Sequence, residues 1–318
     1  MNDSIGDFNA FPFNDGYVDV MGTIKGAPTP SNEVTLASAD LVEGMEKRGF
    51  DTLWLSDTPM TDNVEPILAL TVASQRTRRL KLGTNVVIPG RNPLHLAKEM
   101  AHLDRLSGGR LLLAFMPGIG SPIERAALGV EGVDRNARIA RVIELCRAWW
   151  AGEAVTAEYA GFRYDGVLVG PPPLQSPLEI WLGGNGPKSI ELTGTHADGW
   201  LAARASPALA EQCRQGIEAA AVRAGRVMDA EHFGISIPYE RSVLDDATAA
   251  AVMRRAEEGG KMPARADILP VGPDEIRNLL RRHIDAGLSK FVLRPMSLHD
   301  GWDAELDFLA EHLLPMQT

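Results

Sequence analysis

The sequence predicts an α/β fold, a (β/α)8 TIM barrel with one insertion before the fifth strand and another after the seventh. The chain has 318 residues, which is enough for one large barrel domain. Short β-branched or apolar runs alternate with longer segments of helical spacing along most of its length. Eight strand segments alternate with helices in this way, and this order favours a closed parallel barrel over an open sheet.

Four strand–helix units fill the first half of the chain. The first strand is weak, and the helix after it stops at Gly49, because glycine is the usual end of a helix. Asn92 and Pro93 mark the start of the third helix, since asparagine caps a helix and proline suits its first position. The Ser-Gly-Gly of residues 107–109 ends that helix. The expected strands are residues 17–24, 51–56, 80–87 and 110–116, and the expected helices are residues 30–48, 65–75, 92–106 and 138–152.

The alternation resumes in the second half after an interruption. Residues 156–177 combine β-type alternation with a proline run, so we expect a hairpin insertion before the fifth strand. Residues 241–270 form a long insertion after the seventh strand, which is either functional or a solvated decoration. The remaining strands are expected at residues 178–184, 198–203, 232–240 and 290–295, with helices from residue 187 and over residues 207–225, 272–287 and 304–315.

Composition and charge argue against several classes of protein. Apolar residues make up 45% and charged residues 23% of the chain, which is typical of a globular protein. The net charge of −10 leaves no surplus of Lys and Arg to neutralise phosphates, so we expect no nucleic-acid partner. The two distant cysteines predict a reducing cytoplasm rather than a disulfide framework. The first residues do not resemble a signal peptide, and no apolar run has the length of a membrane span.

Several common catalytic motifs do not occur. The sequence has no G-x-S-x-G elbow, no G-x-G-x-x-G fingerprint, no P-loop and no H-E-x-x-H. His95 and His102 lie seven residues apart on one predicted helix, where packed or solvated side chains are a simpler interpretation than metal ligands. Cys146 and Cys213 fall in helical patterns and are most simply buried apolar residues. We therefore expect no metal site.

Candidate site residues lie at the carboxyl ends of the predicted strands, where parallel barrels build their active sites. Asp57 follows the second strand and accepts hydrogen bonds there, either in the site or simply as a loop cap. Thr84 and Asn85 interrupt the third strand, although a buried parallel strand is normally apolar throughout. Pro117 and Gly118 follow the fourth strand, and the missing side chain of the glycine suits a flat ring.

The fifth strand ends in the most glycine-rich turn of the set. Gly183, Gly184, Asn185 and Gly186 directly precede a helix that starts at Pro187. Glycines let backbone N–H groups converge on one point, and the helix adds the positive end of its dipole. A phosphate fits such a turn, and a tight strand-to-helix turn without a ligand is the alternative.

The ordered blocks of the chain resemble the luciferase-like flavin and deazaflavin oxidoreductases. The matching blocks cover about residues 39–293 and are GFDTLWLSD, LGTNVVIPGRNPLHLAKEMAHLDRLSGGRLLLAFMPGIG, PLEIWLGGNGPKSIELTGTHADGWL and VGPDEIRNLLRRHIDAGLSKFVL. The resemblance implies a TIM-barrel oxidoreductase that binds FMN or coenzyme F420, a deazaflavin that carries hydride, and that acts on a small organic substrate. We also expect a homodimer.

The resemblance suggests a purpose for the polar pair in the third strand. In this family that strand carries a bulge, in many members with a non-prolyl cis peptide, which supports the cofactor ring. The matching bond is Asn85–Val86, so the ring would lie against Val86, with Asp57 at the ring edge. The polar atoms of Thr84 and Asn85 would then satisfy one another where the ladder breaks. An ordinary strand with two polar residues is the alternative.

The LWLSD, GTNVV and PGIG blocks resemble the F420-dependent branch more than the FMN-dependent one. The F420 dehydrogenases place a histidine directly after the strand-two aspartate and a glutamate after the glycine that ends strand four. This chain has Thr58 and Ile119 at those positions. A hydride-transferring reductase therefore fits better than a dehydrogenase that must abstract a proton. An FMN-dependent monooxygenase and a non-redox barrel that binds a phosphorylated ligand are the alternatives.

Overall fold

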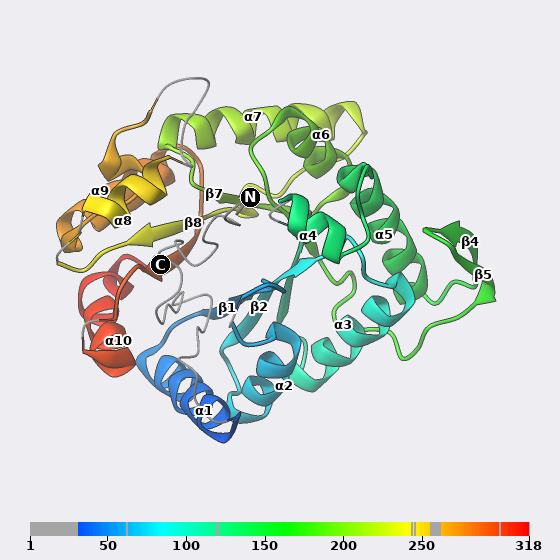
Figure 1. The fold of residues 1–318 in the computed structure, drawn as a ribbon, viewed down its shortest axis with the longest axis horizontal. Helices are drawn as coiled ribbons and strands as arrows, with labels where there is room; N and C mark the ends of the chain where they lie inside the picture. Colours follow the sequence, from blue (N-terminus) through cyan, green and yellow to red (C-terminus); the bar gives the residue numbers. More distant parts are fainter. Residues whose placement is uncertain are drawn as a thin grey trace, which may run out of the picture.

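The computed structural model describes residues 31–61, 63–118, 121–242, 244, 246–254, 262–298 and 300–317. Within them a seven-stranded parallel sheet runs in the order β1-β2-β3-β6-β7-β8-β9. The sheet curves into a barrel inside a ring of helices (Figure 1), as the sequence predicts. The expected first strand, residues 17–24, lies outside the described residues. The seven strands are β1 (Thr52–Ser56), β2 (Lys81–Val87), β3 (Leu111–Met116), β6 (Ile180–Leu182), β7 (Gly199–Ala203), β8 (Phe233–Tyr239) and β9 (Lys290–Pro295).

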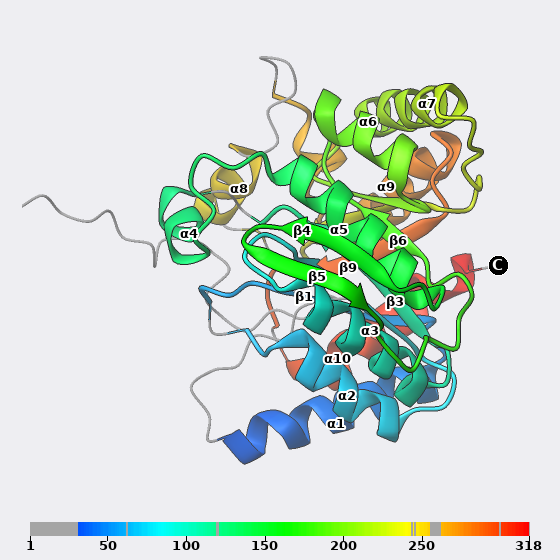
Figure 2. The same cartoon turned by 90° about the vertical axis from the view of Figure 1, so that its right-hand side faces the viewer.

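Eight helices form the ring, and two shorter ones lie across one end of the barrel. The ring consists of α1 (Ser31–Arg48), α2 (Pro66–Arg76), α3 (Pro93–Ser107), α5 (Arg135–Trp150), α6 (Pro187–His196), α7 (Pro207–Arg223), α9 (Gly272–Asp285) and α10 (Gly301–His312). The two others are α4 (Pro122–Ala127) and α8 (Asp246–Met253). Each follows the carboxyl end of a strand, and both lie on that same end of the molecule (Figure 2).

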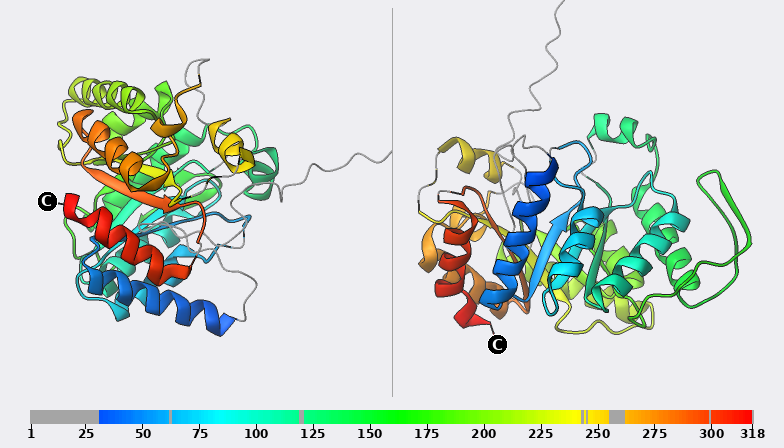
Figure 3. Two further views of the ribbon diagram at one scale, coloured as in Figure 1. Left: turned by 90° about the vertical axis from the view of Figure 1, so that its left-hand side faces the viewer. Right: turned by 90° about the horizontal axis from the view of Figure 1, so that it is seen from below.

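An antiparallel hairpin separates α5 from β6. Its strands are β4 (Val155–Tyr159) and β5 (Phe162–Val167), so the hairpin starts one residue before the segment expected to form it, residues 156–177. The hairpin lies outside the helix ring (Figure 3). The Trp149 indole of α5 holds it, because Nε1 donates to the carbonyl of Val167 at 3.0 Å and the ring meets Tyr164 edge-on at 5.0 Å.

Helix ends follow the expected local chemistry. The Asn92 side chain caps α3 by accepting a hydrogen bond from the backbone N–H of Leu94 at 2.9 Å, and Pro93 is the first helical residue. Gly108 ends the same helix in the left-handed conformation, at φ +72°. The expected cap and stop of this helix are confirmed.

Alternate strand residues face the two sides of the barrel wall. Outward residues such as Leu55, Val86 and Phe115 pack against the helices in the main core. A second cluster fills the barrel interior and comprises Trp54, Ala114, Trp181, Leu201 and Val292. The two indoles fit because glycines face them. A Cβ atom would lie 2.1 Å from Trp54 at Gly83 and 2.4 Å from Trp181 at Gly199.

Strand β2 is regular, so the expected bulge is wrong. Its register runs without a shift against both neighbours, with Asn85 opposite Ser56 and Ala114. The described cis peptide bonds are Gly170–Pro171 and Ser176–Pro177, and Asn85–Val86 is not among them. The ladder needs no break, because Asn85 Nδ2 donates to Ser56 Oγ at 3.0 Å and the Asn85 carbonyl accepts from the N–H of Asp57 at 2.8 Å.

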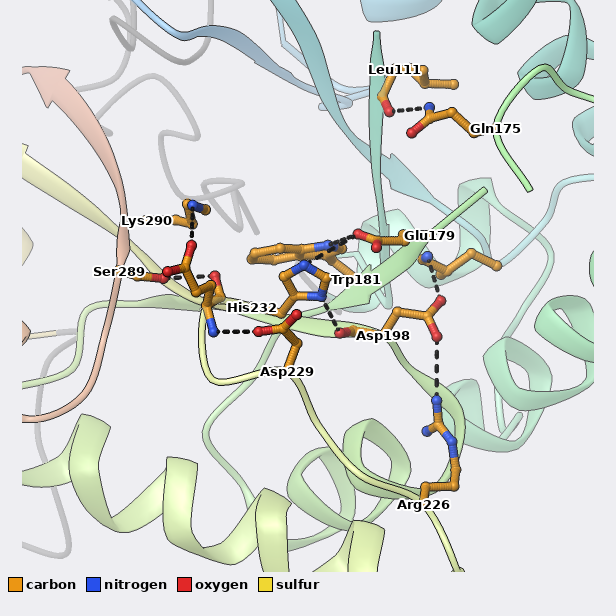
Figure 4. A network of polar contacts seen from close by, with 12 residues as sticks. Leu111, Gln175, Glu179, Trp181, Asp198, Arg226, Asp229, His232, Ser289 and Lys290 are labelled. Carbon is orange, nitrogen blue, oxygen red and sulfur yellow. Dashed lines mark hydrogen bonds and ion pairs between the residues drawn. The ribbon is translucent and has the colours of Figure 1, made fainter. Parts of the chain in front are cut away.

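A polar network closes the amino end of the barrel (Figure 4). Asp198 directly precedes β7, and its Oδ2 accepts from the backbone N–H of Ile180 at 2.9 Å and from Arg147 at 2.6 Å. The His232 ring lies 5.4 Å from that of Trp181, and its Nδ1 lies 3.0 Å from the Asp198 carbonyl. This end of the barrel is therefore held by side chains that precede the strands, and the opposite end is left for the site.

Candidate active site

The structure brings four of the predicted strand ends together. Strands β1, β2, β3 and β6 are consecutive neighbours in the sheet. Their carboxyl ends therefore place Asp57, Asn85, Gly118 and the glycine turn, residues 183–186, along one arc of the barrel rim. Helix α4 lies at the same end, following β3. This arc is the candidate active site.

Asp57 is 9% exposed and tied to its surroundings. Its Oδ2 accepts from the backbone N–H of Val87 at 3.0 Å and from Arg91 Nη2 at 2.7 Å. Arg91 also donates through Nε to the Val87 carbonyl at 3.1 Å. These contacts join Asp57 to the last residue of β2 and to the segment that follows it. Asp57 therefore fixes the β2–α3 loop at the rim.

Glu65 is a second carboxylate beside this ion pair. It caps α2, since Oε2 accepts from the backbone N–H of Leu68 at 2.8 Å, and its Oε1 lies 3.8 Å from Arg91. Burial raises the pKa of the Glu65 carboxyl and Asp57 adds to that rise, while the Leu68 N–H and Arg91 oppose it. Glu65 is therefore easier to protonate than an exposed glutamate.

The three predicted β2 residues face different sides of the barrel wall. Asn85 alternates with Val86 and lies on the side of the interior residue Gly83, and its buried Oδ1 has no hydrogen-bond partner among the described residues. Thr84 and Val86 are fully buried, and Val86 packs in the core under the helices. The expectation that a ring rests on the Val86 side chain is therefore wrong. The Asn85 carboxamide is the β2 group that faces the barrel interior.

Two groups hold the turn after β3. Arg135 Nη1 donates to the carbonyls of Pro117 at 2.8 Å and Gly118 at 3.3 Å. Gly118 has φ +76°, a conformation that favours glycine. The Glu124 carboxylate of α4 lies against this glycine, 3.0 Å from where a Cβ atom would be. Ile119, at the position where the resemblance implies a glutamate, is outside the described residues.

The glycine turn has the geometry of a cradle. Gly184 has φ +101°, and a Cβ atom there would lie 2.7 Å from Ser189 Oγ. Helix α6 starts at Pro187 without a side-chain cap on its first N–H groups. Asn185 Nδ2 donates to the Ala203 carbonyl at 3.1 Å, while its buried Oδ1 has no partner in the described part of the chain. An uncapped helix start beside tight glycines suits an anionic group such as a phosphate.

Local sequence patterns did not lead us to several residues of the rim. Arg91 and Arg135 act through long-range contacts that no local spacing reveals. A signal for Glu124 does exist, because Ser121 and Glu124 form the S-x-x-E pattern of a capping box, and Ser121 Oγ accepts from the N–H of Glu124 at 3.1 Å. Glu65 likewise precedes a proline at a helix start.

Two kinds of feature are not found in the part of the chain that the structure describes. Its helices include none that is long and apolar enough to cross a bilayer. Its His, Cys, Asp and Glu side chains form no group of three or more that could hold a metal ion. Cys146 and Cys213 are both buried thiols.

Several curated proteins that are similar to this chain are named as F420-dependent enzymes. An F420-dependent glucose-6-phosphate dehydrogenase of Nakamurella multipartita is 28% identical over 80% of this chain and 85% of its own length. A 5,10-methylenetetrahydromethanopterin reductase of Archaeoglobus fulgidus is 30% identical over 58% of this chain. The match covers 54% of the length of this reductase. It covers 59% and 66% of the length of two other curated relatives.

Solved structures share the fold. A monooxygenase from Streptomyces bottropensis superposes with a TM-score of 0.75 at 23% identity, over 95% of this chain and 99% of its own. The F420-dependent tetrahydromethanopterin reductase of Methanopyrus kandleri has a TM-score of 0.73 at 19% identity, with the same coverage. The family model for luciferase-like monooxygenases matches residues 21–290. Because this match spans most of the chain, the chain belongs to the luciferase-like monooxygenase family.

Proposed function

We propose that this protein binds coenzyme F420 and transfers hydride between the cofactor and a small organic substrate. The observation that carries the proposal is the glycine turn beside the uncapped start of α6, next to the glycine-ended strand β3. Curated relatives at 26 to 32% identity are named as F420-dependent enzymes, which supports the same cofactor. When bound, a deazaflavin supplies hydride chemistry and no radical or oxygen chemistry is required.

The residues of the rim suit such a cofactor in distinct ways. Gly183, Gly184, Asn185 and Gly186 would hold its phosphate, because their backbone turns tightly below an uncapped helix start. Asn85 would accept a hydrogen bond from a ligand N–H or O–H, since its buried Oδ1 has no partner among the described residues. Pro117 and Gly118 would lie beside the ring, and Asp57 would keep the β2–α3 loop in place. We assign no side-chain role to Thr84 and Val86.

A side-by-side titration tests the cofactor. Apo-protein is mixed with F420 and, separately, with FMN, and the visible absorbance and fluorescence of each are followed. We expect F420 to bind more tightly by at least tenfold. Tighter FMN binding would instead indicate an FMN-dependent enzyme, to which several structural neighbours of the same fold belong. Binding of neither ring would contradict the proposal and favour a non-redox barrel for a phosphorylated ligand.

Assembly and location extend the proposal. We propose a homodimer in which the partner covers exposed apolar side chains of the helix ring, such as Leu68 on α2, which is 68% exposed. Light scattering during gel filtration tests it, and a monomeric mass would contradict it. The chain has only two cysteines, far apart in sequence, and this supports a cytoplasmic protein. We also propose that the chain forms one barrel domain, with residues 156–177 and 241–270 as insertions.

A further inference from the structure

The turn that ends β3 is shaped by a group from outside the turn. Gly118 adopts φ +76°, and the space beside its Cα is filled by the Glu124 carboxylate. A Cβ atom at this position would lie 3.0 Å from Oε2 and 3.2 Å from both Cδ and Oε1. The carboxylate thus occupies the place that a side chain at residue 118 would take. Any larger residue at position 118 must displace it.

Glu124 is itself held firmly. It is 3% exposed, and its backbone N–H donates to Ser121 Oγ at 3.1 Å at the start of α4. The other end of α4 lies against the β2–α3 loop, because a Cβ atom at Gly90 would be 2.8 Å from the Leu128 carbonyl oxygen. Helix α4 therefore bridges the ends of β2 and β3, and Glu124 points from it towards the β3 turn.

Two side chains of opposite charge, Arg135 and Glu124, contact the turn. Arg135 donates to the carbonyls of Pro117 and Gly118, while the Glu124 carboxylate lies against the Gly118 Cα. An apolar side chain could fill the same space, but it would not bring a carboxylate to the turn. Glu124 therefore contributes both shape and polarity at this point.

We propose that Glu124 is a positioning residue that sets the conformation of the Pro117–Gly118 turn against which the cofactor ring lies. The inference rests on the proposed binding of F420 and names the residue that shapes its ring site. Glu124 acts through Gly118 and does not itself need to touch the cofactor. Its role as the partner of Ser121 in a capping box is the purely structural alternative.

A double-mutant cycle with matched glycine controls tests the proposal, with F420 itself as the probe. The variants are Glu124→Ala, Gly118→Ala and the double variant, and Glu124→Gln keeps the shape of the side chain should the alanine variants fail to fold. Gly129→Ala is the control for backbone strain, because Gly129 has φ +64° and no atom near its Cβ position. Glu131→Ala, at an exposed position, is the control for loss of a nearby carboxylate.

We expect Glu124→Ala and Gly118→Ala each to weaken F420 binding at least tenfold, and each control to stay within twofold of wild type. The double variant should bind at least as well as Gly118→Ala alone, because removing the carboxylate relieves the clash. The absorbance spectrum of F420 at saturation should also shift in Glu124→Gln, because the neutral amide removes the carboxylate from beside the turn while keeping its shape. Loss of a helix cap alone would lower the unfolding temperature and leave that spectrum unchanged.

Three outcomes overturn the inference, and they can be told apart. Wild-type affinity and an unshifted spectrum in folded Glu124→Gln and Glu124→Ala would remove the positioning role and leave the proposed function intact. Failure of the wild-type protein to bind F420 would remove both. Additive effects of the two alanine substitutions would show that Glu124 and Gly118 do not act together, and would also count against the inference.

Discussion

Single residues at the rim combine structural and binding roles. Asp57 is the clearest case, because one carboxylate oxygen accepts from both the Val87 backbone and Arg91. A site residue that is also a tertiary anchor cannot be altered without moving the loop that it holds. The loss of function in its variants must therefore be compared with their loss of stability.

Replacing Asp57 by Ala leaves the partly buried Arg91 with the more distant carboxylate of Glu65, at 3.8 Å. We expect a loss of about 3 kcal/mol in the free energy of unfolding, because removing one partner of a buried ion pair leaves the other charge poorly compensated. F420 affinity should fall at least tenfold, or about 1.4 kcal/mol. Urea unfolding and cofactor titration measure the two effects. Unchanged affinity in the folded variant would show that Asp57 is only a loop anchor.

His283 on α9 makes the stability of the folded protein depend on pH. The ring is fully buried, and neither nitrogen has a hydrogen-bond partner among the described residues. Burial, with Arg282 adding to the effect, lowers the pKa of His283 from 6.5 to about 4. Because the folded-state pKa is depressed, the neutral form is favoured. The part of the stability that depends on neutral His283 is fully present above pH 6.5 and is lost as the pH falls towards 4.

The variant His283→Leu removes this titration. We expect wild type to lose about 3 kcal/mol relative to the variant between pH 6.5 and pH 4, at about 1.4 kcal/mol per pH unit. Urea unfolding at half-unit pH steps measures the difference. Parallel stability curves for the two proteins over this range would contradict the prediction.

At the scale of elements, sequence patterns predict the helix ends and the order of strands and helices, because these depend on residues close together in the chain. The cap at Asn92, the stop at Gly108 and the alternating strands and helices all follow from neighbours in sequence. The β2 bulge was wrong, because the polar side chain of Asn85 finds its partner on β1, across the sheet. The short helix α4 was missed, since six residues carry too few repeats of a helical period.

The loop that follows the hairpin depends on one buried carboxylate. Asp104 of α3 is fully buried, and its Oδ2 accepts from the backbone N–H groups of Leu174 at 2.6 Å and Gln175 at 3.0 Å. Its Oδ1 accepts from Gln175 Nε2 at 2.7 Å. These contacts attach the returning end of the insertion to the barrel. No spacing rule relates residues so far apart in sequence.

Replacing Asp104 by Ala should release this loop while the barrel persists. We expect a loss of about 3 kcal/mol, because two backbone donors and an amide lose a charged acceptor. Hydrogen exchange of residues 168–178 should accelerate at least tenfold, with little change in β2 and β3. Glu99→Ala, at an exposed position of the same helix, is the control. Equal exchange in wild type and Asp104→Ala would contradict the prediction.

For the whole molecule, the packing of the barrel interior depends on large side chains on some strands facing glycines on the adjacent strands. The indoles of Trp54 and Trp181 fill the interior only because Gly83 and Gly199 on adjacent strands have no side chains. The order of strands was predicted from the sequence, but this pairing of large and small residues was not. It joins positions on different strands whose register becomes known only once the sheet is formed.

Replacing Gly83 by Ala tests the fit directly. The new methyl group would lie 2.1 Å from the Trp54 ring, and the surrounding layer is filled. We expect a loss of about 3 kcal/mol or more, at the upper end of overpacking effects. Gly129→Ala, where nothing lies near, should cost about 1 kcal/mol. Thermal unfolding compares the two, and a stable Gly83→Ala protein would show that the indole can move aside.

The fluorescence of the two interior indoles can also report when a cofactor binds. They lie inside the same wall whose carboxyl ends form the candidate site. An indole emits in the near ultraviolet, where a deazaflavin or flavin absorbs, so a ring arriving at the rim would quench that emission by energy transfer. Cofactor entry can thus be timed in the unlabelled protein, and Trp54 and Trp181 can be distinguished by replacing each in turn with phenylalanine.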